Sequence, residues 1–165
     1  MKGAFILVLL LLSGCIGGEP PPRDSGIGMP VERNLSKIVL GPEDLGAGWV
    51  LATENVTADV YERRFIRVEY SFGAASKLTN RIHLYPSRET AMSDFLLAAR
   101  QLRETPSTIS PQVGDDSVLW TRDSQGYLLF IRGEILVELE HTSSGLAEPD
   151  FLIGLAQKTD SRITG

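Results

Sequence analysis

The sequence predicts a single α+β domain over residues 34–165, with an antiparallel β-sheet of about five to seven strands and two packed helices. Several segments alternate apolar and polar residues, the pattern of a strand with one buried face, and two others carry apolar residues at helical spacing. The connections before Tyr61 and after Pro106 are too short to hold crossover helices. Because parallel strands need such crossovers, we expect antiparallel pairing.

The first part of the domain is predicted to hold four strands. Segments 36–40 and 49–53 are expected as short strands, and the glycine-rich residues 41–48 between them indicate a turn or one helical turn. The clearest strand covers 66–72, where apolar and polar residues alternate. Residues 78–85 are expected to pair with it. One face of that partner strand holds Ile82 and Leu84, and the other holds Arg81, His83 and Tyr85.

A helix of about four turns is predicted after Ser87, which stands where an N-cap residue would, and before Pro106, which stops the run. Its apolar stripe comprises Ala91, Met92, Phe95, Leu96, Ala99 and Leu102. A second helix is predicted from Pro149, since proline suits the first helical position. Its stripe comprises Phe151, Leu152, Leu155, Ala156, Thr159 and Ile163.

Between these helices the segments 118–120, 127–131 and 135–139 are predicted as strands. Gly133-Glu134 has the form of a two-residue type II′ hairpin loop, because glycine accepts a positive φ at the first position. This loop predicts the hairpin register and so the faces of both strands. The expected pairs are Phe130 with Val137, Leu128 with Leu139, Leu129 with Glu138 and Tyr127 with Glu140. The second face is half apolar, so we expect another element to cover part of it.

The N-terminus carries the most specific motif of the chain. Residues 5–12 form an apolar run behind Lys2 that, at about 1.5 Å per residue, is too short to span a bilayer core of about 30 Å. The run ends in Leu12-Ser13-Gly14-Cys15, which resembles the lipobox of prokaryotic lipoproteins. The resemblance implies cleavage before Cys15 and lipidation of its thiol with diacylglyceryl and fatty acyl chains such as palmitate. An ordinary secretory signal with a chance cysteine is the alternative interpretation.

The resemblance divides the chain into residues 1–14 as signal peptide, 15–33 as lipidated cysteine and Gly/Pro-rich tether, and 34–165 as the globular domain. It places the protein on the extracytoplasmic face of the cell membrane, attached through Cys15, which is the only cysteine. Two acyl chains on one residue give durable attachment, whereas one chain gives marginal binding. The formal net charge of −5 argues against a nucleic-acid partner, because binding a polyanion needs clustered positive charge.

The residues that could carry chemistry form no recognisable catalytic or metal-binding set. His83 and His141 lack further ligands at suitable spacing, and His83 is interpreted as an ordinary surface histidine. Asp115-Asp116 could form an acid or metal-binding pair, but the preceding glycine favours a turn. Glu138 and Glu140 could form an acidic binding surface, but a solvated strand face is favoured. We therefore predict no catalytic residue, no metal and no cofactor.

Two further pairs of residues are noted. Trp49 and Trp120 could line a pocket or pack in the core. Asn34 and Asn55 each begin an Asn-x-Ser/Thr motif and are possible glycosylation sites, which matter only in a host with that machinery.

A second resemblance covers the domain itself. It rests on Asp44-Leu45-Gly46-Ala47-Gly48-Trp49, on Val113 to Val118, on Phe130 to Leu139 and on Leu155 to Ile163. These segments resemble a pattern in extracytoplasmic sensor domains and small lipoproteins, which implies an antiparallel sheet with packed helices. Some of those sensor domains have disulfides that this chain lacks, and the resemblance assigns no functional residue.

Together these observations predict a membrane-anchored extracytoplasmic lipoprotein that acts as a non-catalytic binding or interaction module of the cell envelope. Its expected partners are the membrane, through the lipid on Cys15, and either a small amphiphile or an envelope protein. The ligand-binding residues are not identified by the sequence. Two alternatives stay open: a structural or assembly factor of the envelope, and a hydrolase without a recognisable motif.

Overall fold

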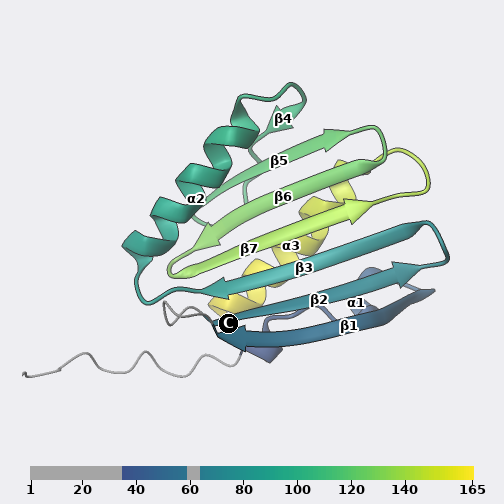
Figure 1. The fold of residues 1–165 in the computed structure, drawn as a ribbon, viewed down its shortest axis with the longest axis horizontal. Helices are drawn as coiled ribbons and strands as arrows, with labels where there is room; N and C mark the ends of the chain where they lie inside the picture. The colour runs from purple at the N-terminus through teal and green to yellow at the C-terminus, as the bar shows by residue number, and fades with distance from the viewer. Residues whose placement is uncertain (1–34, 59–63) are drawn as a thin grey trace, which may run out of the picture. The chain divides into compact units, whose positions relative to one another are not determined.

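A seven-stranded antiparallel sheet is the framework of the described part of the chain (Figure 1). The computed structural model describes residues 35–58 and 64–165, and within them the strand order is β1-β2-β3-β7-β6-β5-β4. The strands are β1 (Trp49–Ala58), β2 (Arg64–Phe72), β3 (Ser76–Leu84), β4 (Thr108–Ile109), β5 (Asp116–Arg122), β6 (Gln125–Arg132) and β7 (Ile135–Thr142). The helices are η1 (Leu35–Lys37), α1 (Pro42–Leu45), α2 (Arg88–Arg103) and α3 (Pro149–Thr164). The predicted α+β class, with a single domain, is confirmed.

The chain builds the sheet in two blocks. Strands β1, β2 and β3 follow one another as neighbours, and α2 then leads to β4 at the far edge. Strands β5, β6 and β7 return toward the first block, until β7 pairs with β3 from Leu84↔Ile135 to Lys77↔Thr142. The last strand of the chain therefore lies in the middle of the sheet.

The start of the domain differs from the sequence prediction. Residues 36–40 were expected to form a strand, but Leu35–Lys37 form a 3₁₀-helix, and the amide groups of Ile38 and Val39 both donate to the Leu35 carbonyl. The physical reason is burial, because Leu35, Ile38 and Leu40 all enter the core. A helical turn brings residues three apart onto one side, which a strand cannot do. Of the two forms expected within 41–48, a turn or one helical turn, the structure shows the helical turn, α1.

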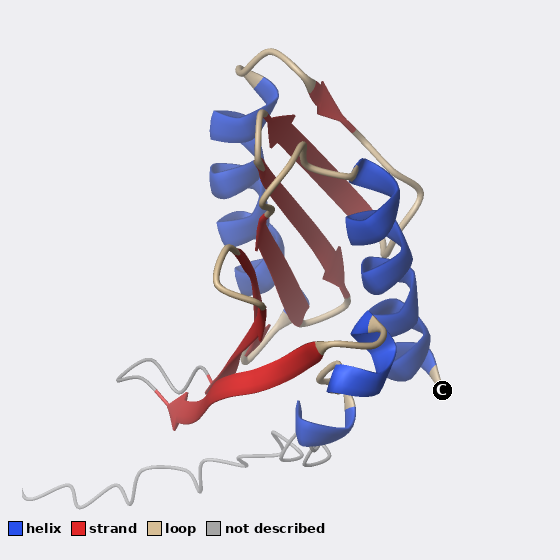
Figure 2. Ribbon diagram, turned by 90° about the vertical axis from the view of Figure 1, so that its right-hand side faces the viewer, coloured by secondary structure: helices blue, strands red, loops and turns tan. Residues whose placement is uncertain are grey.

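Helix α3 covers one face of the sheet, as Figures 1 and 2 show. Apolar residues of both strand blocks form the core on this face, together with η1 and α1. The predicted stripe of α3 is confirmed for Leu152, Leu155, Ala156 and Thr159, which are buried. The hydroxyl of Tyr70 donates to the Leu40 carbonyl, and Arg162 of α3 forms an ion pair with Asp44 of α1 at 2.8 Å. These bonds hold the N-terminal segment against β2 and α3.

Helix α2 covers the opposite face over the block β4–β7, with its main contacts to β5, β6 and β7. Ser87 caps it as predicted, with its hydroxyl accepting from the Thr90 amide. The second core on this side is smaller and comprises Tyr85, Ala91, Phe95, Ala99, Val118, Leu129, Ile131 and Leu136. The expectation that an element covers the half-apolar face is thus confirmed. Leu96, predicted in the stripe, is 49% exposed.

The β6–β7 hairpin has the predicted register, with Phe130↔Val137, Leu128↔Leu139, Leu129↔Glu138 and Tyr127↔Glu140. Gly133 has a φ of +59°, as the predicted turn requires. Residues outside the hairpin stabilise this turn. The Gly133 amide donates to Asp115 at 3.0 Å, and Arg132 forms ion pairs with Asp115 and Asp160. Of the pair Asp115-Asp116 that was favoured as a turn, Asp115 lies in the bend after Gly114 and its carboxylate is engaged by these donors, whereas Asp116 is the first residue of β5.

The N-terminal predictions fall outside the described residues. This applies to the signal peptide, to Cys15, to the tether and to Asn34. In the described ranges, no helix combines the length and apolar character that crossing a bilayer would demand.

Replacing Gly133 by valine should destabilise the domain by about 1–3 kcal/mol, because a β-branched residue is strained at positive φ. A Cβ at this position would have no atom within 4 Å, so the loss would report backbone strain and not a clash. Gly145→Val is the matched control, since this loop glycine has no positive φ and its nearest atom is 4.0 Å away. Urea melts of both variants make the comparison, and equal losses would contradict the turn assignment.

Candidate functional site

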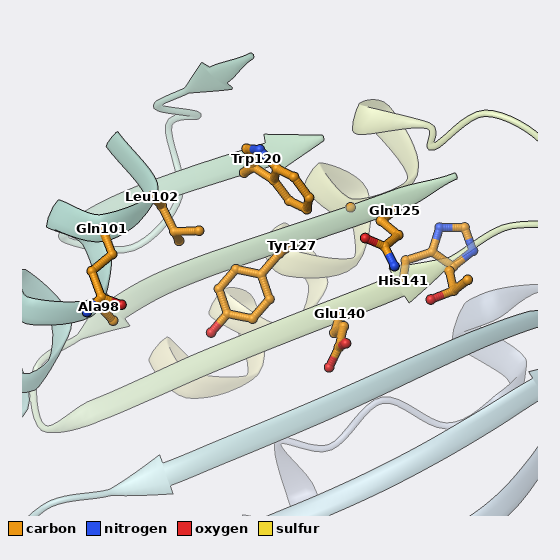
Figure 3. A pocket seen from close by; sticks show the side chains of 10 residues that line it. Ala98, Gln101, Leu102, Trp120, Gln125, Tyr127, Glu140 and His141 are labelled. Atoms are coloured by element: carbon orange, nitrogen blue, oxygen red, sulfur yellow. The ribbon is translucent and has the colours of Figure 1, made fainter. Parts of the chain in front are cut away.

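A cavity of about 310 Å³ lies between the C-terminal half of α2 and strands β5, β6 and β7 (Figure 3). This volume is at the lower end of the range of small-molecule sites. The lining residues are Ala98, Gln101, Leu102, Trp120, Gln125, Gly126, Tyr127, Glu140, His141 and Thr142. The helix thus supplies one wall, and the three strands supply the others.

The antiparallel register places three of these residues in one row across the sheet. Trp120 of β5 pairs with Tyr127 of β6, which in turn pairs with Glu140 of β7. Directly paired residues point to the same face of a sheet. The row therefore presents an indole, a phenol and a carboxylate side by side. The alternative in which Trp120 lines a pocket is the one that the structure supports.

Next to this row, Glu138 is the centre of a polar cluster. Its carboxylate accepts from the Tyr127 hydroxyl at 3.0 Å and from Arg81 at 3.2 Å, and it lies 3.0 Å from Nε2 of His83. Arg81 also pairs with Glu140 at 3.1 Å. Strand β7 brings the glutamates to β3, which carries Arg81 and His83.

Two sequence interpretations are corrected by this cluster. Glu138 is not on a solvated strand face, since its side chain is only 20% exposed and is surrounded by partners. His83 is not an ordinary surface histidine, since its side chain is 21% exposed and faces Glu138. Both errors have one cause. The pairing of β3 with β7 places these side chains together, and the sequence pattern of neither strand predicts that pairing.

The electrostatics of the cluster keep Glu138 ionised. Burial acts to raise its pKa, but the contacts with His83, Arg81 and Tyr127 outweigh burial and hold the pKa of Glu138 below its ordinary value. Burial, reinforced by Glu138, raises the pKa of Tyr127, so the phenol stays protonated. A catalytic acid at neutral pH needs a raised pKa. Glu138 has the opposite shift, and its role is to hold Tyr127 and Arg81 in position.

His141 and Trp49 belong to the other face. The His141 ring lies 5.0 Å from Phe151 and 6.0 Å from Trp49, and Trp49 stacks on Phe151 with 14° between the ring planes. Burial lowers the pKa of His141, so its imidazole is neutral at pH 7. Trp49 thus packs beside the α3 core, whereas Trp120 alone of the two lines the cavity.

The remaining candidates form no site in the described ranges. Asp116 pairs with Arg103 at 2.9 Å, and Asp115 with Arg132 at 3.0 Å, so the acid pair is bound by arginines. No group of three or more potential metal ligands occurs among residues 35–58 and 64–165. Asn55 is exposed on β1, where its possible glycosylation stays a prediction.

The sequence analysis missed most of the cavity. Tyr127, Gln101 and Leu102 were placed on the right elements, but no local pattern marks them as lining residues. The available signal was the half-apolar second face of the β6–β7 hairpin. Apolar side chains on that face must pack against another element, and the polar residues at the end of the same face mark the limit of this packing.

Comparison with solved structures finds the same fold in an extracellular domain. The extracellular domain of PknH from Mycobacterium tuberculosis superimposes with a TM-score of 0.58, over 79% of this chain and 95% of that one. The sequence identity is 8%, so the likeness is one of fold. This agrees with the resemblance to extracytoplasmic sensor domains. No protein-family model matches the sequence, and no curated protein matches it.

Glu138→Ala should destabilise the domain by about 2–3 kcal/mol, because it leaves Arg81 and the Tyr127 hydroxyl without their partly buried acceptor. Glu140→Ala is the control on the same strand and face. Its side chain is 49% exposed and shares Arg81, so its loss should be below about 1 kcal/mol. Chemical denaturation at pH 7 compares the variants. A smaller loss for Glu138→Ala than for Glu140→Ala would refute the central position of Glu138.

Proposed function

We propose that this protein is a lipid-anchored binding module of the extracytoplasmic face, and that the cavity under α2 holds a small amphiphile. The cavity itself is the observation that carries this proposal. It combines apolar walls from Ala98 and Leu102 with two aromatic rings, and it borders a polar floor formed by Arg81 and Glu138. An amphiphile would place its apolar part under α2 and its polar group toward β7.

The location rests on separate support. Leu12-Ser13-Gly14-Cys15 has the form of a lipobox, and the fold is that of an extracellular domain in PknH. Both point outside the cytoplasm. A protein held at the membrane surface would meet amphiphilic ligands at high local concentration.

Catalysis is not favoured by the side chains at the cavity. The neighbouring partly buried carboxylate, Glu138, already accepts from Tyr127 and Arg81, and its pKa is lowered. A second candidate, an interaction role in envelope assembly, is favoured by the edge strand β1. Among the described residues, β1 pairs on one side only, and Val50, Leu51 and Val56 are 57%, 49% and 64% exposed. Long apolar edge strands of this kind accept an added strand.

Occupancy of the cavity can be tested by native mass spectrometry of the detergent-extracted mature protein. The wild type should carry a co-purifying small molecule. Ala98→Phe should lose it, because the larger ring fills the cavity, whereas Leu97→Phe should retain it, since Leu97 is 66% exposed and outside the lining. A bound molecule that survives Ala98→Phe would refute this site. Absence of any bound molecule from the wild type would favour the interaction role.

The anchor is tested by Cys15→Ala. Without the thiol neither lipid attachment nor lipid-dependent cleavage is available, so the variant should remain uncut or leave the membrane fraction. Cells labelled with a radioactive fatty acid provide the measurement. If the wild-type protein takes up no label, the lipoprotein interpretation is wrong.

A further inference from the structure

The charged side chains of the cavity lining are of one sign, negative. Of its ten residues, Glu140 is the only carboxylate, and none is a lysine or an arginine. The other titratable residues of the lining do not offset it: Tyr127 remains a protonated phenol, and the His141 ring, which packs on Phe151 at the opposite face, is held neutral by burial. The lining therefore presents a net negative charge to whatever enters.

The neighbouring cation does not cancel this charge. Arg81 lies outside the lining and is shared between two carboxylates, with Nη1 on Glu138 and Nη2 on Glu140. Only Oε2 of Glu140 is bonded to Arg81, and the Glu140 side chain is 49% exposed. One guanidinium thus faces two negative groups. An entering cation would find a carboxylate that is already oriented and still accessible.

The two aromatic rings of the lining are suited to the same kind of ligand. Trp120 and Tyr127 are direct cross-strand partners, so both side chains stand on the cavity face of the sheet, where Figure 3 shows them. The Tyr127 ring is held by the bond from its hydroxyl to Glu138. Aromatic faces attract cations, and tryptophan does so most strongly.

We propose that the cavity selects an organic cation, an ammonium group carrying alkyl substituents, which Glu140 pairs with while Trp120 and Tyr127 flank it. This inference rests on the proposed function and gives its ligand a chemical class. Alkyl substituents are required for two reasons. Ala98 and Leu102 provide apolar contact, and an alkylated ammonium loses less hydration on entry than a primary amine does.

The test is an NMR titration of the full-length chain purified in a maltoside detergent, which contains no ammonium group. The probes are choline and its uncharged isostere 3,3-dimethylbutan-1-ol. Choline should shift the indole N–H signal of Trp120 saturably and bind about tenfold tighter than the isostere, a difference of about 1.4 kcal/mol. The indole signal of Trp49, which packs on the other face, should not move.

A matched pair of variants isolates the carboxylate. Glu140→Gln should weaken choline binding several-fold and leave the affinity for the isostere unchanged. Glu104→Gln should change neither, because this exposed residue caps α2 and lies outside the lining. Trp120→Leu should lower the choline affinity about tenfold, as expected for loss of a cation–π contact.

The outcomes separate this inference from the proposed function. Equal affinity for choline and the isostere would overturn the preference for a cation and leave the cavity as a binding site. If neither probe binds, the inference that the cavity selects an organic cation is overturned as well. In that case an uncharged or anionic molecule that co-purifies with the wild type and not with Ala98→Phe would still uphold the proposed function.

Two sources could supply the alkylated ammonium group: a free solute or a lipid headgroup. Dihexanoylphosphocholine, used below its critical micelle concentration, carries the same group on a lipid. Tighter binding of this lipid than of choline assigns the site to headgroups, and the reverse order assigns it to free cations. Dihexanoylphosphoglycerol, which lacks the ammonium group, is the control, and binding as tight as that of the phosphocholine would overturn the inference.

Discussion

The pairing of β3 with β7 is the contact on which the rest of the structure depends. It joins the block β1–β3 to the block β4–β7 along eight residue pairs. On the α3 face, Ile82 of β3 lies opposite Val137 of β7, so a single core crosses the junction. Without this pairing, the core on the α3 face would be divided at the junction, and each block would expose apolar side chains.

The same junction separates an apolar from a polar region on the other face of the sheet. On one side of it, the residues beneath α2 are apolar, and on the other side β3 presents Arg81 and His83. Glu138 stands at the boundary, where burial would be costly for a carboxylate without partners. Its bonds to both strands satisfy it and orient Tyr127 as well. The cavity therefore lies where the helix cover ends and the polar floor begins.

Local patterns were reliable where the structure itself is local. The β6–β7 hairpin was predicted in its register, because the turn type and the alternation of side chains specify it together. The N-cap of α2 followed from Ser87, and the start of α3 followed from Pro149. The failure at 36–40 arose because three apolar residues in a short segment fit either a strand or a helical turn. Docking against β2 and α3 decided between them.

The sequence by itself determined the α+β class, the position of both long helices and of most strands, and the lipobox motif from which the lipid anchor is predicted. These depend on neighbours along the chain: periodicity, turn residues and caps. Only the tertiary structure decided that β7 inserts beside β3, that Arg81 meets Glu138, and that Trp120 joins the predicted pair of Tyr127 and Glu140 in one row. Strand order is set by packing between residues far apart in sequence, so no local pattern contains it.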